Sequence, residues 1–263
     1  MNLRKNTPKL HYSTYLLIFN PNRLSYCVFS LLNLSVKGPY SKIIPMEIFA
    51  DTTDYFENDE MVRESYENAS LRYREKYERM KTPSGKRLEL LVSVLLNRAL
   101  SSYGLSEKDM LYLENDNGKP FFKAYPEILF SVSHSGNAAV VAMERASDSA
   151  FSSSGLRFKK TPDHITLLGI DIEKLRTDIS QNEKIAGRFF TPDEAIYLSS
   201  LNADKKAYAF TDIWTKKEAY IKAIGTGLTT ELDSFNVLKD IPGFTFKTHD
   251  LIPDYIITSC VKK

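Results

Sequence analysis

The sequence predicts an α+β protein of two halves, each with helices packed on mainly antiparallel strands. Apolar residues recur at helical spacing over 88–103, which predicts a buried helix. Short apolar runs flank Asn117-Gly118, a dipeptide that strongly indicates a β-hairpin. A second helix is predicted over 213–224, and strand-like runs follow it. These terminal strands are expected at 234–237, 244–246 and 255–258.

Composition limits the class of protein. The chain has 263 residues, a length sufficient for one large or two small domains. Its formal net charge of +2 gives no overall reason to bind nucleic acid or a membrane. Cys27 and Cys260 are the only cysteines and lack metal-binding spacing, which favours a cytoplasmic location. No apolar run reaches the ~18–20 residues of a membrane-spanning helix, and no signal peptide is predicted.

The first 45 residues are predicted to be an N-terminal extension. Its apolar runs at 15–19 and 27–34 could form two extra strands, whereas a strand at 46–50 starts the regular alternation of elements. A Ser-rich and Lys-rich loop at 146–163 separates the two halves. The expected organisation is an extension over 1–45, an N-terminal half over 46–160 and a C-terminal half over 161–263.

The N-terminal half combines a basic helix with a strand that ends in a polar turn. One helix is predicted over 57–79, and positive charge is in excess from its second half onward. Such a face is either solvated or a binding site for phosphate groups. The strand at 128–133 leads into a turn at His134, which is either a turn residue or a ligand group, and 138–143 is a strand or short helix. The basic residues are Arg72, Arg74, Lys76, Arg79, Lys81, Lys86 and Arg87.

The apolar strand predicted at 165–173 ends in two carboxylates. Because side chains alternate along a strand, Asp171 and Glu173 share one face. Acids side by side repel each other unless a cation or water separates them. Farther along, Thr191-Pro192-Asp193-Glu194 predicts the capped start of another helix.

Asp212 is expected to cap the start of the helix over 213–224, and the turn that begins at Gly225 is expected to stop it. It carries Glu218 and Lys222 four residues apart on one face. On their own these two residues indicate a surface ion pair worth ~0.3–0.5 kcal/mol.

A different interpretation follows if this helix packs against the end of the strand. Glu218 then joins Asp171 and Glu173, and three carboxylates offer the oxygen ligands that suit Mg²⁺ or Mn²⁺. With basic residues upstream, they indicate metal-assisted transfer of a phosphoryl-type group.

Two segments resemble the signature pair of the Sfp-type 4′-phosphopantetheinyl transferase family. They are Gly169-Ile170-Asp171-Ile172-Glu173 and Trp214-Thr215-Lys216-Lys217-Glu218-Ala219-Tyr220-Ile221-Lys222. Shorter matches in the same order extend the resemblance over about residues 46–240. These are Gly118-Lys119-Pro120, Ser131-Val132-Ser133-His134-Ser135, Arg188-Phe189-Phe190 and the segment 227–235.

The resemblance implies a monomer of two pseudo-symmetric α+β halves with coenzyme A in the cleft between them. It implies transfer of the 4′-phosphopantetheine arm to a serine of an acyl or peptidyl carrier protein, with release of adenosine 3′,5′-bisphosphate. Asp171, Glu173 and Glu218 would hold Mg²⁺, Glu218 would activate the serine, and Lys222 would neutralise the transferred phosphate. The residues implied to bind the coenzyme are Lys76 or Arg74, Arg87, Lys119, Ser133 and His134.

Two other functions are compatible with parts of the pattern. Clustered acids beside a lysine also serve a metal-dependent phosphodiesterase or nuclease, although such an enzyme would not require Ser133-His134 or Gly118-Lys119. A basic helix alone would suit a non-catalytic nucleotide-binding module, which leaves the carboxylates at the strand end unexplained.

A chain that begins at Met46 is expected to fold and to stay active, because the regular elements start there. Circular dichroism and an activity assay of this shortened chain test the expectation. An unfolded product would contradict the assignment of residues 1–45 as an extension.

Overall fold

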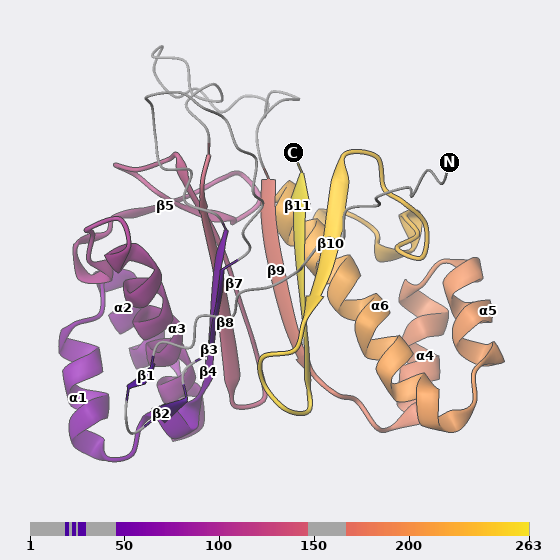
Figure 1. The fold of residues 1–263 in the computed structure, drawn as a ribbon, viewed down its shortest axis with the longest axis horizontal. Coiled ribbons are helices and arrows are strands. Elements are labelled where there is room, and N and C mark those ends of the chain that lie inside the picture. Colours follow the sequence, from indigo (N-terminus) through magenta and orange to yellow (C-terminus); the bar gives the residue numbers. More distant parts are fainter. Residues whose placement is uncertain (1–18, 21–22, 25, 30–45, 147–166, 263) are drawn as a thin grey trace, which may run out of the picture.

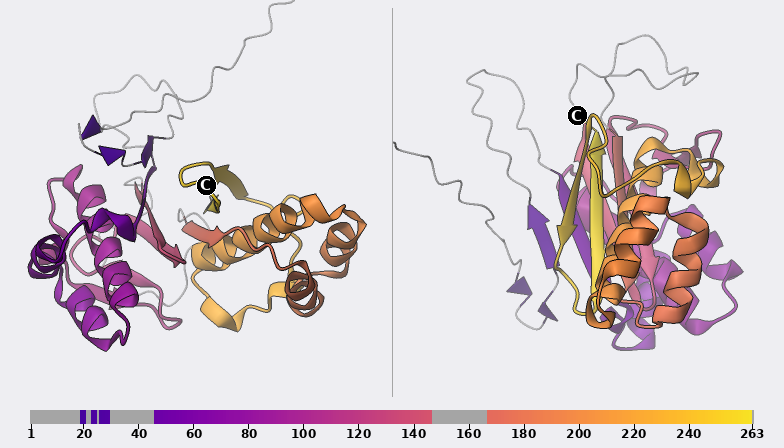
Figure 2. Two further views of the ribbon diagram at one scale, coloured as in Figure 1. Left: turned by 90° about the horizontal axis from the view of Figure 1, so that it is seen from below. Right: turned by 90° about the vertical axis from the view of Figure 1, so that its right-hand side faces the viewer.

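Two larger antiparallel sheets, each with its own helices, and two small two-stranded ladders make up the described part of the chain. The computed structural model describes residues 19–20, 23–24, 26–29, 46–146 and 167–262. Figure 1 shows the halves side by side with the strands toward the centre, and Figure 2 shows each set of helices against the strands of its own half. The predicted α+β class is confirmed. The predicted boundary at 160/161 lies outside the described residues.

The N-terminal half contains a four-stranded sheet and three helices. Its strands, in spatial order, are β3 (Tyr26–Phe29), β4 (Glu47–Thr52), β8 (Ala138–Arg145) and β7 (Ile128–Ser135). Its helices are α1 (Asp59–Glu67), α2 (Leu71–Arg79) and α3 (Pro83–Ser101), with 3-10 turns η1 (Thr53–Tyr55) and η2 (Glu107–Asp109). Two small antiparallel ladders pair β1 (Phe19–Asn20) with β2 (Arg23–Leu24), and β5 (Tyr112–Glu114) with β6 (Pro120–Phe122).

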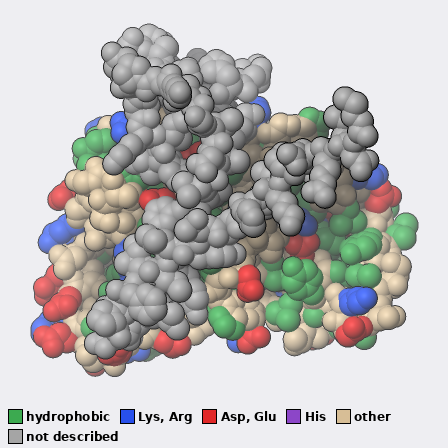
Figure 3. Space-filling model, in the orientation of Figure 1, with side chains coloured by type: hydrophobic (Ala, Val, Ile, Leu, Met, Phe, Trp, Pro, Cys, Tyr) green, Lys and Arg blue, Asp and Glu red, His purple; other side chains and the backbone are tan. Residues whose placement is uncertain are grey.

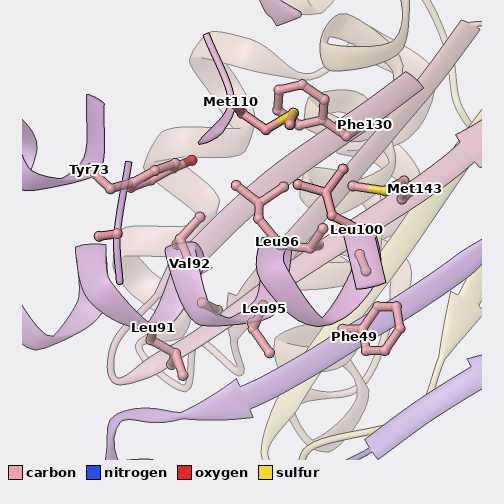
Figure 4. Close-up of a cluster of buried hydrophobic side chains, with 14 of the residues drawn as sticks. Phe49, Tyr73, Leu91, Val92, Leu95, Leu96, Leu100, Met110, Phe130 and Met143 are labelled. Carbon is pink, nitrogen blue, oxygen red and sulfur yellow. The ribbon is translucent and has the colours of Figure 1, made fainter. Parts of the chain in front are cut away.

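The core of this half lies between α3 and one face of the sheet (Figure 4). Leu91, Leu95 and Leu100 of α3 are fully buried there, together with Val141 and Met143 of β8. Because strand side chains alternate, the intervening residues of β8 face the opposite way, toward the second half.

The C-terminal half contains a three-stranded sheet and three helices. Its strands, in spatial order, are β10 (Phe244–His249), β11 (Tyr255–Lys262) and β9 (Leu167–Lys174). Its helices are α4 (Ile179–Phe189), α5 (Pro192–Ser200) and α6 (Ala203–Ile224), with 3-10 turns η4 (Gly227–Thr229) and η5 (Leu232–Ser234).

A second apolar cluster joins the two halves. Ile48 of β4 and Val140 of β8 pack with Ile170 and Ile172 of β9 and with Ile257 of β11, and all five side chains are buried. Since Ile170 and Ile172 point into this cluster, the residues between and after them on β9 point toward the opposite face. That face carries the two predicted carboxylates.

Several predicted local signals are confirmed. The hairpin between β5 and β6 has Gly118 at a φ of 82°, a conformation that glycine adopts without strain. Thr191 and Glu194 form the predicted capping box, and Gly225 ends α6 at a φ of 69°. The segment 138–143, left open between strand and helix, is part of β8, and the strand predicted to end at Ser133 continues to Ser135.

Other predicted elements are wrong. The single helix over 57–79 is two helices, because the chain turns at Ser70, whose amide donates a buried hydrogen bond of 2.8 Å to the Glu107 carboxylate. Asp212 is not a cap but lies inside α6, where it accepts a hydrogen bond of 2.7 Å from Lys216. No strand forms at 234–237, since Ser234 is the last residue of η5 and Val237 packs into the helical core. Helix α4 was not predicted.

The N-terminal extension contributes to the first sheet. β3 pairs antiparallel with β4 over residues 26–29 and 47–50, so it continues the sheet beyond β4. The first of the two apolar runs lies almost wholly outside the described residues, as does the end of the second.

The surface shows apolar as well as charged side chains. On the face seen in Figure 3, hydrophobic side chains gather over the C-terminal half. Large exposed hydrophobic residues of that half are Ile196, Tyr197, Tyr208 and Leu238. Within the described ranges, no helix is both long and apolar enough to cross a bilayer.

Gly169 allows α6 to lie directly on β9. A Cβ atom at this position would come within 2.0 Å of the Ala219 carbonyl oxygen and 2.4 Å of the Ala223 amide nitrogen. Both atoms belong to the helix backbone and cannot rotate away, so only glycine permits this approach. The approach brings the last turns of α6 against the first residues of β9.

Replacing Gly169 by alanine is therefore expected to lower the free energy of unfolding by about 1–3 kcal/mol or more, because the helix must move off the strand. Urea unfolding measures the change. Gly187→Ala is the matched control: it lies within α4, a new Cβ would meet nothing within 4 Å, and the change should be neutral or stabilising. Equal stability of both variants would show that the contact is not tight.

Candidate active site

Serines on β7 connect the two sheets where their edge strands meet. The Ser131 hydroxyl accepts a hydrogen bond of 3.0 Å from the Ile170 amide. The Ser133 hydroxyl donates to Asp171 Oδ1 at 2.7 Å, and the Ser135 hydroxyl donates to Glu173 Oε2 at 2.8 Å. These serines alternate along β7 and so face the same way. They orient both predicted carboxylates of β9 from the other half.

Lys222 of α6 completes this arrangement. Its ammonium donates to Asp171 Oδ1 at 2.6 Å and to the Ser133 hydroxyl at 2.7 Å. The ion pair that the sequence suggested between Glu218 and Lys222 is thus replaced by one between Lys222 and Asp171. Three elements that are distant in sequence meet at one point.

Glu218 lies in a strongly anionic environment. Burial raises the pKa of its carboxyl group, Asp171 and Glu173 raise it further, and Lys222 opposes them. Glu173 itself is half-buried and accepts from Arg176 at 3.3 Å as well as from Ser135. Asp171 and Glu173 are thus close enough to Glu218 to contribute to the raised pKa of its carboxyl group.

The three carboxylates fit a divalent cation by their chemistry, although they do not already form a closed cage. In the described ranges, no three acidic, histidine or cysteine side chains stand at the spacing of a preformed metal site. Asp171 Oδ2, however, is buried and has no hydrogen-bond partner among the described residues. A buried carboxylate oxygen without a donor is expected to have a partner, and a cation is one that an oxygen-rich site accepts.

A cavity of about 630 Å³ opens beside these residues. Both halves line it: Lys119 and Val132 come from the first, and Glu218, Lys222 and Arg188 from the second. Its volume is in the range of pockets that bind small molecules and cofactors.

The other predicted coenzyme-binding residues divide into two groups. Lys76 and His134 are not among the residues that line the cavity, but they lie close to each other: burial lowers the pKa of His134, Glu89 opposes this, and Lys76 and Lys222 lower it further. Lys76 also pairs with Glu89 at 3.3 Å. Arg87 lies 3.5 Å from Asp59, on the exposed surface between α3 and α1.

Lys119 has partners that the sequence did not indicate. Its ammonium donates to the carbonyl oxygens of Leu168 and Ala223, both at 3.0 Å. Burial lowers the pKa of Lys119 to about 8.

Sequence reasoning missed Ser131 and Ser135 as residues that orient the site, and Arg188 as a residue that lines the cavity. The alternation of serines along one strand was a signal that could have identified the first two. Arg188 belongs to the matching segment Arg188-Phe189-Phe190, but the match alone did not indicate a role for its side chain.

Comparison with known proteins agrees with this arrangement. Residues 167–260 match the family model of the 4′-phosphopantetheinyl transferase superfamily. A 4′-phosphopantetheinyl transferase of Bacillus subtilis is 32% identical over 173 residues, which cover 65% of this chain and 67% of the relative. The transferase Sfp of Bacillus subtilis strain 168 is 30% identical over 200 residues, which cover 71% and 79%. The transferase ffp of Bacillus subtilis is 30% identical over 207 residues, covering 74% and 82%.

An α+β enzyme with an acidic site between two halves is thus the class that fold and site define. The chain belongs to the 4′-phosphopantetheinyl transferase superfamily and resembles its Sfp-type members. It is a 4′-phosphopantetheinyl transferase that acts on carrier proteins, and its family uses coenzyme A as substrate.

Proposed function

We propose that this chain transfers the 4′-phosphopantetheine moiety of coenzyme A to a serine hydroxyl of an acyl or peptidyl carrier protein, with Mg²⁺ or Mn²⁺, and releases adenosine 3′,5′-bisphosphate. The observation that carries the proposal is the meeting of Asp171, Glu218 and Lys222 beside a cavity that both halves line. We further propose that the enzyme is a cytoplasmic monomer.

Asp171, Glu173 and Glu218 would hold the divalent cation. The unpartnered Oδ2 atom of Asp171 and the raised pKa of Glu218 support this assignment. Bound to these oxygens, Mg²⁺ would neutralise negative charge on the pyrophosphate of the coenzyme. Ser133 and Ser135 hold two of the carboxylates in place through hydrogen bonds from the other half.

Glu218 is the proposed general base for the carrier serine. It lines the cavity, and its raised pKa brings it closer to the pH at which proton transfer from a hydroxyl is efficient. Lys222 lines the same cavity one helical turn away, where its ammonium can neutralise charge on the phosphate being transferred.

Basic and polar residues of the N-terminal half would contact the remaining phosphates of coenzyme A. Ser133, His134 and Lys76 have the most support: Ser133 accepts a hydrogen bond from Lys222, which lines the cavity, and His134 is electrostatically coupled to both Lys76 and Lys222. Arg87 would have to leave Asp59 to take part. Lys119 lines the cavity too, although its ammonium donates to two backbone carbonyls.

The direct test is to incubate the enzyme with Mg²⁺, coenzyme A and an apo carrier protein, and to weigh the carrier by mass spectrometry. Addition of one phosphopantetheine mass to the carrier is the expected result. If none of several acyl and peptidyl carriers gains this mass, the proposed reaction is wrong.

Glu218→Gln is expected to keep the fold and to lose at least ~100-fold in turnover, because an amide cannot accept the serine proton and is a poorer cation ligand. The same mass assay, read as a rate, measures the loss. Glu183→Gln is a matched control on the exposed surface of α4, where it pairs with Lys206, and it should behave as the wild type. Near-normal turnover of the Glu218 variant would remove this residue from the mechanism.

Chelation of divalent cations is expected to stop transfer, because three carboxylates and a pyrophosphate repel one another without a cation. Activity should return when excess Mg²⁺ or Mn²⁺ is added back. Undiminished turnover in chelator would mean that Asp171, Glu173 and Glu218 act without a metal.

A further inference from the structure

The tip of the β5–β6 hairpin lies against the C-terminal end of α6, although the two belong to different halves. Asn115 Nδ2 donates to the Gly225 carbonyl oxygen at 3.1 Å. Lys119 Nζ donates to the Ala223 carbonyl oxygen at 3.0 Å and to the Leu168 carbonyl oxygen of β9 at the same distance. The last carbonyls of a helix have no partner within the helix, and a cation there is favoured by the helix dipole. The hairpin therefore caps the helix that carries Glu218 and Lys222.

The hairpin tip is organised to hold these donors. Asn115 Oδ1 accepts from the amides of Asn117 and Lys119 at 3.0 and 2.8 Å. The backbone amide of Asn115 in turn donates to the backbone carbonyl of Lys119 at 3.0 Å. One asparagine thus closes the turn with its oxygen and caps α6 with its nitrogen.

The contact is close on both sides. A Cβ atom at Gly225 would lie 3.0 Å from Cδ of Lys119 and 3.2 Å from Nδ2 of Asn115. One at Gly227 would lie 3.1 Å from the Asn117 carbonyl oxygen. Because both glycines also have positive φ values, the chain after α6 is shaped to receive the hairpin.

The Lys119 ammonium is hydrogen-bonded to backbone carbonyl groups. Both of its described partners are carbonyl oxygens, and burial lowers the pKa of the group to about 8. To reach a phosphate in the cavity, the ammonium would have to break two hydrogen bonds and release the end of α6. Lys119 lines the cavity in this position, with its ammonium bonded to the two carbonyl groups.

We propose that Lys119 is a positioning residue, which acts with Asn115 to fix the last turn of α6 against β9 and the N-terminal half, rather than a ligand of the coenzyme phosphates. Ala223 directly follows Lys222 in the chain, so the bond from Lys119 holds the turn in which the reacting lysine sits. The inference rests on the proposed roles of Lys222 and Glu218.

Three variants separate the possible roles. Lys119→Met keeps the alkyl length but removes the donors. Asn115→Asp keeps the oxygen that closes the turn but sets a carboxylate against the Gly225 carbonyl, and it leaves the Lys119 side chain in the protein. Lys123→Met is the matched control, since this exposed lysine follows β6 in the same hairpin.

Steady-state transfer and calorimetric binding of coenzyme A are measured for each variant. The proposal expects Lys119→Met and Asn115→Asp each to lower kcat about 10- to 100-fold, because small displacements of reacting groups have effects of this size. The KM and the dissociation constant for coenzyme A should stay within about threefold, since no ground-state contact is lost. Lys123→Met should match the wild type.

Other outcomes overturn the proposal. If Lys119→Met weakens coenzyme binding tenfold or more while Asn115→Asp is normal, Lys119 is a phosphate ligand. If both variants only lower the melting temperature and leave kcat and KM unchanged, the cap is structural and does not position the site. If Lys119→Met does not fold, the kcat and the coenzyme A affinity of Asn115→Asp decide the question. Failure of the wild type to modify any carrier would refute the proposed function. The affinities of the variants for coenzyme A would still show whether Lys119 is a phosphate ligand or a cap of α6.

Discussion

Lys222 donates to Asp171 and Ser133, and this contact joins α6, β9 and β7, which come from both halves of the chain. A half-buried ammonium beside a buried carboxylate is costly to separate, because neither charge would then have a partner. The serine adds a neutral hydroxyl that bonds to both. Removal of Lys222 or Asp171 would leave the charge of the other without its ion-pair partner, so the seam between the sheets and the position of the last turns of α6 depend on the same contact.

The residues of this site could be predicted from the sequence because they follow local patterns of spacing. Alternation along a strand put Asp171 and Glu173 on one face, and helical spacing put Glu218 and Lys222 on another. The pairing was not predictable from spacing, since Lys222 bonds to a carboxylate 51 positions away instead of to the one four positions away. Lys119 is a similar case: its two carbonyl partners lie 49 and 104 positions along the chain. Helix α4 was missed because its sequence is mostly polar, and it is placed by buried contacts such as that of Asn182 with the Arg176 carbonyl.

A second lysine of the same helix has a different structural role from its neighbour in sequence. Lys217, next to Glu218, is fully buried and pairs with the fully buried Glu194 at 2.8 Å. Its ammonium also donates to the carbonyl oxygens of Leu232 and Phe235, at 2.8 and 2.6 Å. Such a pair is tolerated in a core only when its remaining donors and acceptors are satisfied. Here the donors hold the segment around η5, part of which lines the cavity. Glu218 lines the cavity, while its neighbour Lys217 supports the cavity wall.

The absence of a side chain at Gly169 has a consequence for the divergence of the family. Where a helix rests on a strand through side chains, each substitution in the layer between them shifts the helix, and neighbouring positions must change together. Here the main chains of β9 and α6 touch directly, so their separation at this point is set by atoms that every amino-acid sequence contains. Surrounding core positions can then exchange one apolar residue for another without moving α6 away from β9. A sequence of this fold that keeps glycine at this position can thus vary at many others and still hold Glu218 and Lys222 beside the cavity.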